Sequence, residues 1–326
     1  MKRNILIAVA FMATMTMAAQ NIAVVNSNNE TKTYLTLDTA IKGAENGSII
    51  YLPGGGWVIN DTTVINKRLT IMGVSHRGDT DNTDGATIIG GNLNFVKGSS
   101  GSAVMGCYIS GNVNVGTSDD GVNNILIKYC NLNSIQVKNS LSNDMIVNQC
   151  YVRDLSHFGN TNVTFKNNIS SGIMEINGGT IINNVLYNGR ANEYHYYCLT
   201  ANNSIISYNV FIGYNYHRYD PNTQVEGSNN QGEFNITKGY NWGDDCIDIG
   251  SEEWTNVLEK SNGISIKSIF HLIGDYAKYD NKIGIYGGSG FNKDALAPIP
   301  RIVSKTVDEQ TDGSGRLLIN ITVKAQ

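Results

Sequence analysis

Six short segments between positions 104 and 209 repeat one pattern, and this repeat constrains the fold more than any other feature of the sequence. Each segment has an apolar residue, then Cys or Asn three positions later, then further apolar residues. A unit of 16 to 25 residues is too short to bury an apolar face alone, so its repetition predicts a solenoid. Every unit is strand-like, so we expect an all-β, single-stranded parallel β-helix. The repeated Cys and Asn positions are Cys107, Cys130, Cys150, Asn168, Asn184 and Asn209.

Asn and Cys have architectural roles in such a fold. The chain contains 43 Asn, of which 27 lie between positions 101 and 250. Asn tolerates left-handed backbone at turns, and its amide stacks in ladders along a solenoid. Cys107, Cys130 and Cys150 occupy equivalent inward positions on successive coils, where parallel Cβ vectors suit thiol packing better than disulfides. Cys198 and Cys246 remain as the one plausible disulfide pair.

The N-terminus has the features of an export signal. Lys2 and Arg3 precede an apolar run over 5–15, and small residues follow at 16–18. We therefore predict a signal peptide over 1–18 and a secreted protein, whether periplasmic, cell-surface or extracellular. No later stretch reaches the length of a membrane span. The net charge of −4, without any basic run, argues against nucleic acid as a partner.

The region after the signal predicts a cap for the open end of the solenoid. Leu37, Ala40, Ile41 and Ala44 fall on one helical face, with Thr36 as the N-cap. A strand over 48–52 and a Pro-Gly-Gly-Gly turn over 53–56 follow. A helix before the first strand would cover the unpaired backbone groups of a terminal strand.

Two stretches resemble a known family. Residues 35–59 with 67–74 resemble the beginning of right-handed parallel β-helices of the pectate-lyase-like type. Residues 270–272 and 281–288 resemble the final coil of secreted β-helix proteins of Bacteroidetes, except that Lys282 replaces an acidic residue. The resemblance implies one right-handed parallel β-helix with its N-terminal cap over 19–290. It implies a fold and does not specify an activity.

The remaining residues, 291–326, differ from the repeats. Two strand-like runs begin at Ile302 and at Leu317, and Asp-Gly-Ser-Gly over 312–315 separates them. This pattern predicts a β-hairpin. We expect this C-terminal tail to pack on or after the last coil.

Acidic residues suggest two enzymatic alternatives. A polysaccharide lyase needs carboxylates that hold Ca²⁺ and a cationic base. The catalytic candidates are Arg218, Lys238, Asp244, Asp245 and Asp248. A glycoside hydrolase needs two acids across a cleft, and Glu175, Glu193, Glu226 and Glu233 are available.

Metal binding has little support in the sequence. The acidic run over 79–85 has its Gly one place too late for an EF-hand loop, so a solvated loop is the better interpretation. His157, His195 and His217 do not fall in a metal-ligand spacing. We expect no metal site and no cofactor, with Ca²⁺ as the one ion to consider.

Aromatic residues concentrate where the repeat is interrupted. Flat apolar rings with polar edges suit sugar rings, so these residues predict a glycan-binding shelf. We expect an exported β-helix that binds or processes polysaccharide. The alternatives are a lyase or hydrolase acting at 194–248, and a structural surface adhesin. The candidate glycan-binding residues are Tyr194, Tyr196, Tyr214, Tyr216, His217 and Trp242.

Overall fold

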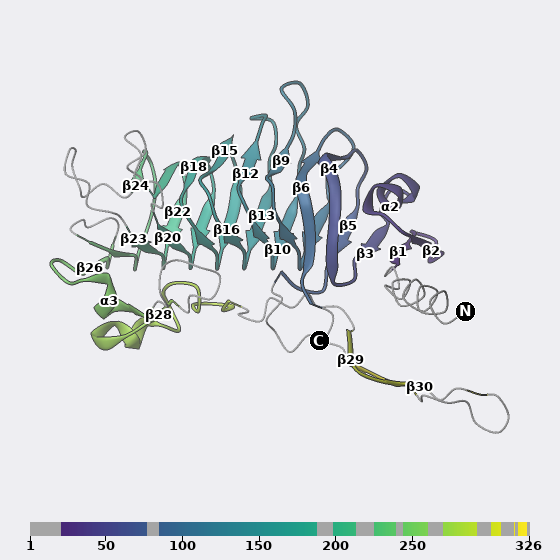
Figure 1. The fold of residues 1–326 in the computed structure, drawn as a ribbon. Coiled ribbons are helices and arrows are strands. Elements are labelled where there is room, and N and C mark those ends of the chain that lie inside the picture. The colour runs from purple at the N-terminus through teal and green to yellow at the C-terminus, as the bar shows by residue number, and fades with distance from the viewer. Residues whose placement is uncertain are drawn as a thin grey trace, which may run out of the picture.

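A computed structural model of the chain describes most of residues 21–324 (Figure 1). The described ranges are 21–76, 85–187, 198–212, 225–238, 244–259, 270–291, 301–307, 316 and 319–324. The predicted signal peptide over 1–18 lies outside them, as does nearly all of the acidic run over 79–85. The chain is all-β with large parallel sheets, which is consistent with a β-helix or solenoid.

A small antiparallel unit and a helix begin the described chain. Strand β1 (Ile22–Val25) pairs antiparallel with both β2 (Thr31–Tyr34) and β3 (Ile49–Tyr51). Helix α2 (Leu37–Gly43) confirms the predicted helix, and the Thr36 hydroxyl accepts a hydrogen bond from the Thr39 N–H at 3.3 Å. The Lys67 ammonium donates to the Ala44 carbonyl at 2.9 Å, which satisfies a carbonyl at the end of the helix. The hairpin β1–β2 was not predicted.

Parallel strands from successive coils form three rows, which we call the first, second and third rows. The first row continues from β3 through β5 (Thr70–Met72), β7 (Ala103–Met105), β10 (Leu126–Lys128), β13 (Met145–Asn148), β16 (Val163–Lys166), β19 (Thr180–Ile182) and β22 (Ile205–Ser207).

The second row follows the first across a sharp bend. Its strands are β8 (Tyr108–Ile109), β11 (Asn131–Leu132), β14 (Tyr151–Val152), β17 (Ile169–Ser170), β20 (Val185–Tyr187), β23 (Val210–Ile212), β25 (Ile236–Thr237) and β26 (Ile247–Asp248).

The third row completes each coil. Its strands are β9 (Val113–Val115), β12 (Ile135–Val137), β15 (Ser156–Thr161), β18 (Ile173–Asn177), β21 (Leu199–Asn202) and β24 (Val225–Glu226). The longer strands β4 (Gly55–Ile65) and β6 (Thr87–Phe95) pair with each other, and β6 joins the second and third rows in one sheet.

The register of the first row confirms the repeat. Neighbouring strands pair the apolar residues that precede each Cys or Asn by three positions. All six of these side chains are fully buried, as are the Cys and Asn that follow them. The paired apolar residues are Val104, Ile127, Val147, Phe165, Ile181 and Ile206.

The bend between the first and second rows contains a ladder of side-chain donors. The Asn184 amide donates to the Phe165 carbonyl of the preceding coil at 2.8 Å, and its Oδ1 accepts the Asn168 N–H at 2.9 Å. In the earlier coils a thiol takes the same place, since Cys150 Sγ donates to the Ile127 carbonyl at 3.6 Å. The ladder continues one coil further than predicted, because Asn235 donates to the Ile206 carbonyl at 2.7 Å.

The residue before each ladder position has left-handed backbone. Examples are Tyr129 (φ 54°), Asn183 (φ 58°) and Phe234 (φ 52°). This conformation costs about 1–2 kcal/mol for a residue with a Cβ. The bend is stabilised because the N–H of this residue bonds to the next coil, as for Tyr129 to the Asn148 carbonyl at 3.2 Å. The ladder side chain that follows adds further bonds.

Not every apolar residue of the first row points inward. Ile146 is 42% exposed, because its neighbours Met145 and Val147 point inward and side chains alternate along a strand. The interior is otherwise apolar, and Phe158 packs edge-on against Phe165 with ring centroids 6.0 Å apart.

The suggested Cys198–Cys246 disulfide is also wrong. No disulfide joins these two residues in the structure. Cys246 follows Asp245, which has left-handed backbone (φ 49°), and precedes β26, so it occupies the next ladder position after Asn235. Cys198 directly precedes β21, at the corner between the second and third rows. The two thiols therefore belong to different edges of the coil.

We expect the buried thiols to resist alkylation in the native protein. Burial raises the pKa of the Cys107 and Cys150 thiols, which lowers the fraction of reactive thiolate. Iodoacetamide followed by mass spectrometry should label half-buried Cys246 faster than either. Under denaturing, non-reducing conditions we expect Cys107, Cys130 and Cys150 all to be labelled. A disulfide between any two of them would contradict the stacked-thiol arrangement.

A second apolar core lies outside the coils. The segment 270–291, which we call the strap, packs with the outward residues of the second row. Ile169, Val185 and Val210 are fully or almost fully buried, and they belong to this outer core and not to the interior of the coils. The strap is also not a further coil, because β28 (His271–Leu272) pairs antiparallel with β27 (Leu258–Glu259) and is followed by the 3-10 helix η1 (Gly274–Tyr279). Figure 1 shows α3 (Trp254–Val257) and β28 outside the stack of strands.

Bend residues hold the strap by hydrogen bonds. The buried Asn167 amide donates to the carbonyls of Ile285 and Gly287, both at 2.8 Å. Asn183 donates to the Lys282 carbonyl at 2.6 Å, one coil further along. Gly284 has φ 75°, a left-handed conformation that glycine adopts readily, and a Cβ there would be in ordinary van der Waals contact with Val210 Cγ2 at 3.4 Å.

The departure from the family pattern at Lys282 has a structural role. The Lys282 ammonium lies 3.5 Å from the centroid of the Phe234 ring, and this ring stacks on Tyr208 at 5.4 Å. A cation over an aromatic face contributes about 0.5–2 kcal/mol. The Tyr208 hydroxyl donates to Glu233 at 2.8 Å, and this bond raises the pKa of Tyr208.

The predicted C-terminal hairpin is present. Strand β29 (Arg301–Val307) pairs antiparallel with β30 (Ile319–Lys324). The turn predicted over 312–315 lies outside the described residues. Packing of the tail on the last coil stays a prediction.

Candidate functional site

The outward side chains of the third row form a polar surface. Inward residues of this row, such as Val113, Ile135 and Leu199, are buried, and the residues that alternate with them point outward. Parallel pairing aligns these outward residues from coil to coil. We call them the outer row: Asn94, Asn114, Gln136, His157, Met174, Thr200 and Glu226.

Neighbouring side chains of the outer row contact one another. The Asn114 amide donates to Asn94 Oδ1 at 2.7 Å, and the Thr200 hydroxyl lies 2.7 Å from Met174 Sδ. Coils of a parallel sheet repeat every ~4.8 Å, so the outer row presents one side chain per coil along a straight line. Amides and a hydroxyl at this spacing can donate to and accept from a polyhydroxylated chain lying along the stack.

A β-bulge interrupts the outer row in its C-terminal half. Between β18 and β21 the register shifts, so that Met174 and Glu175 both lie opposite Thr200. Glu175 is the extra residue and has left-handed backbone (φ 63°). Bulges redirect side chains, and a non-glycine residue in this conformation costs about 1–3 kcal/mol. The bulge turns the Glu175 carboxylate toward the outer row.

The bulge brings Glu175 close to His157. His157 Nδ1 lies 3.8 Å from Glu175 Oε1, and both side chains are partly exposed, at 36% and 49%. Glu226 is exposed on β24, one strand beyond Thr200. The C-terminal half of the outer row therefore combines two carboxylates, an imidazole and a hydroxyl, all accessible from outside the coil.

Two long insertions begin and end beside this surface. Residues 188–198 connect β20 to β21, and residues 213–224 connect β23 to β24. Tyr187 pairs with Ile212 before the insertions, and Leu199 pairs with Val225 after them, so both insertions leave and rejoin at neighbouring coils. The same corner has only two residues, 171–172, between β17 and β18.

The insertions contain most of the predicted glycan-binding residues. The strands before the two insertions pair with each other, and so do the strands after them. Both insertions therefore begin and end at the same corner of neighbouring coils. All six candidates, together with Arg218, lie outside the described residues, so their roles stay predictions. The six are Tyr194, Tyr196, Tyr214, Tyr216, His217 and Trp242.

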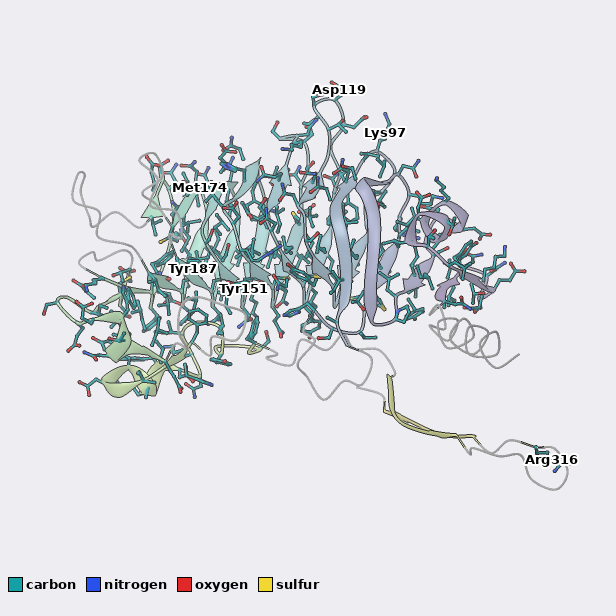
Figure 2. All side chains as sticks on the ribbon, viewed as in Figure 1. Lys97, Asp119, Tyr151, Met174, Tyr187 and Arg316 are labelled. Carbon is teal, nitrogen blue, oxygen red and sulfur yellow. The ribbon has the colours of Figure 1, made fainter. Side chains whose placement is uncertain are left out.

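A buried tyrosine pair supports the same corner from the second row. Figure 2 shows Tyr151 and Tyr187 near each other, and both belong to the outer core that includes the strap. Burial raises the pKa of Tyr187 strongly, and the neighbouring Tyr151 hydroxyl raises it further. Tyr187 therefore remains a neutral, packed residue at the point where the first insertion begins.

The structure separates the described catalytic candidates. Lys238 follows β25 at the insertion corner and lies 3.5 Å from Glu253, and Asp248 accepts the Gly250 N–H at 2.9 Å. Asp244 pairs with Glu233, and Asp245 takes the left-handed bend position, both on the opposite edge of the coil. The acidic cluster does not converge on one point, and catalytic roles for these residues stay predictions.

His157 and Glu175 were missed as a pair by sequence reasoning. His157 was considered only as a metal ligand, and Glu175 only as one of several acids. Met-Glu-Ile-Asn over 174–177 has the alternation of a regular strand, so no signal in it indicates a bulge.

Comparisons with known proteins leave the site to be interpreted from its geometry. No family model, curated protein or solved structure matched the chain. Within the described ranges, no three or more His, Cys, Asp or Glu side chains group in a way that could hold a metal ion. In the same part of the chain, no helix has the length and apolar character needed to cross a membrane.

Proposed function

We propose that the chain is an exported, right-handed parallel β-helix of the pectate-lyase-like type that binds polysaccharide along its outer row. The observation that carries the proposal is the alignment of amide, hydroxyl, imidazole and carboxylate groups from Asn94 to Glu226, one on each coil except at Met174, which is buried. The two insertions begin and end beside this surface, and their sequences contain tyrosines suited to stacking on sugars. The second row is less suitable, because the strap covers part of it.

We expect Gln136→Ala combined with Thr200→Ala to weaken binding roughly tenfold. Each hydrogen bond to a sugar hydroxyl contributes about 0.5–1.5 kcal/mol, and tenfold corresponds to about 1.4 kcal/mol. A glycan array identifies a ligand, and affinity electrophoresis in gels containing that ligand measures the loss. Thr164→Ala with Thr180→Ala is the matched control, since these residues are paired on the first row.

A second arm tests the insertions. Tyr214→Ala with Tyr216→Ala removes two rings, each contributing about 1 kcal/mol on a sugar, so binding should fall tenfold or more. Unchanged binding by the outer-row variant would place the glycan elsewhere. If only the tyrosine variant binds normally, the insertions are not part of the site. A chain that binds no glycan at all favours the adhesin alternative.

Glycoside hydrolysis is a second candidate, favoured by the placement of two acids. Glu175 and Glu226 are separated by strand β21 alone, which is two strand spacings of ~4.8 Å. Inverting glycosidases hold their two carboxyl groups about 6.5–9.5 Å apart. Release of reducing ends from a bound polysaccharide would establish hydrolysis, whereas absorbance at 235 nm would establish a lyase.

A further inference from the structure

We infer that the polysaccharide recognised by the outer row is uncharged, an inference that rests on the proposed function. The strands of the third row, together with β4 and β6, contain no Lys or Arg. His157 is therefore the one side chain of the outer row that can become cationic. A surface that recognises uronate or sulfate groups without a bridging metal ion needs fixed cations, and Arg is the usual residue where a carboxylate is bound.

Two acidic residues, Glu226 of the outer row and Glu175 of the bulge beside it, also disfavour an anionic ligand. Glu175 and Glu226 are both exposed, so each presents a negative charge to any chain lying along the coils. An anionic polysaccharide would meet two repulsive charges within two coil spacings. A neutral polysaccharide would instead donate its hydroxyl groups to the same carboxylates, and hydrogen bonds to charged acceptors are the stronger kind.

The insertions do not add net charge of either sign. Residues 188–198 contain one Arg and one Glu, and residues 213–224 contain one Arg and one Asp. Each insertion is therefore neutral in net charge when its His is neutral.

Most cations near the third row in the described structure have other partners, and the exception is Lys138, which directly follows β12 and is exposed. Arg153, which lies between the second and third rows, donates to the Tyr108 hydroxyl at 3.0 Å and to the Ser110 carbonyl at 3.1 Å. Lys97 pairs with Asp120 at 3.0 Å, and Lys238 pairs with Glu253. Lys128 and Lys166, by contrast, are on the first row. Apart from Lys138, the positive charge of these residues is directed away from the outer row or is already paired, so one Lys stands against the two carboxylates of Glu175 and Glu226 at this surface.

Matched polymers test the inference. The probes are hydroxyethylcellulose against carboxymethylcellulose, and carboxyl-reduced polygalacturonan against polygalacturonate, so that each pair shares a backbone and differs in charge. In affinity electrophoresis at low salt, we expect at least one neutral polymer to retard the full chain and its anionic partner to do so at least tenfold more weakly. The difference should shrink at 0.5 M NaCl, where screening acts over a few ångströms.

Two variants test whether the carboxylates of Glu175 and Glu226 cause the weaker binding of anionic polymers. Glu175→Gln with Glu226→Gln should strengthen binding to the anionic partner by about fivefold for each charge removed, if each repulsion is about 1 kcal/mol. Glu30→Gln with Glu45→Gln is the control, because it changes the net charge equally at the N-terminal end. If an anionic polymer binds as well as or better than its neutral partner, the inference is wrong, while the proposed function stands. If neither pair nor a glycan array gives binding, the proposed function fails and the inference fails with it.

Discussion

Val210→Asp is expected to lower the free energy of unfolding by about 3 kcal/mol or more. Val210 points outward from β23 but is fully covered, and the strap passes within van der Waals distance of it at Gly284. A carboxylate there would lose its water without gaining a partner, which is among the most destabilising single changes. Urea unfolding measures the effect, and hydrogen exchange of the Gly284 and Gly287 amides reports on the strap itself.

The control for this variant is Ile205→Asp. Ile205 also points outward from a neighbouring strand, but it is 48% exposed, so its change should stay within about 0.5 kcal/mol. Equal effects of the two variants would mean that the strap does not cover the second row. If Val210→Asp is unstable while strap amides keep full protection until global unfolding, Val210 belongs to the inner core.

Asn184→Leu is expected to have an effect of similar size through a different cause. Its amide donates to the carbonyls of Phe165 and Ile182 and to Asn209 Oδ1, and its Oδ1 accepts from the Asn168 N–H. Leu has a similar size but leaves these buried groups without partners, at about 1–3 kcal/mol for each. We therefore expect a loss of at least 3 kcal/mol in urea unfolding.

Asn177→Leu provides the matched comparison. Asn177 is exposed on β18, where its Oδ1 accepts one bond from Asn203 at 2.8 Å. The same substitution should cost less than about 1 kcal/mol there. A stable Asn184→Leu variant would mean that the ladder side chains are not required to satisfy the bend.

The parts of the fold that depend on local periodicity could be predicted from the sequence. The register of the first row and helix α2 were predicted because a ladder residue or an N-cap appears at the required spacing. Asn235 was missed because Gly232 occupies the place where the other units have an apolar residue. Cys246 was missed as a ladder position because the last coil is much shorter than the others.

The outer core could not be predicted for a physical reason. The runs Val185–Tyr187 and Val210–Ile212 are apolar at every position, as in strands that are buried on both faces. Such a run does not indicate which side faces the interior, nor that a distant segment covers the other side. The candidate site was only partly predictable as well. The concentration of aromatic residues indicated the insertions as a site. The register shift that exposes Glu175 depends on unequal coil lengths, and no residue pattern in the sequence indicates it.

The strap has a consequence for how the chain comes apart. In a simple solenoid each coil contacts only its two neighbours, so unfolding proceeds from an end in small steps. Asn167, Asn183 and Tyr208 belong to three successive coils, yet all bond to residues 282–287. Loss of one of these coils therefore weakens the others at once. The C-terminal half of the stack becomes a single cooperative block, while the coils before β13 can fray one at a time.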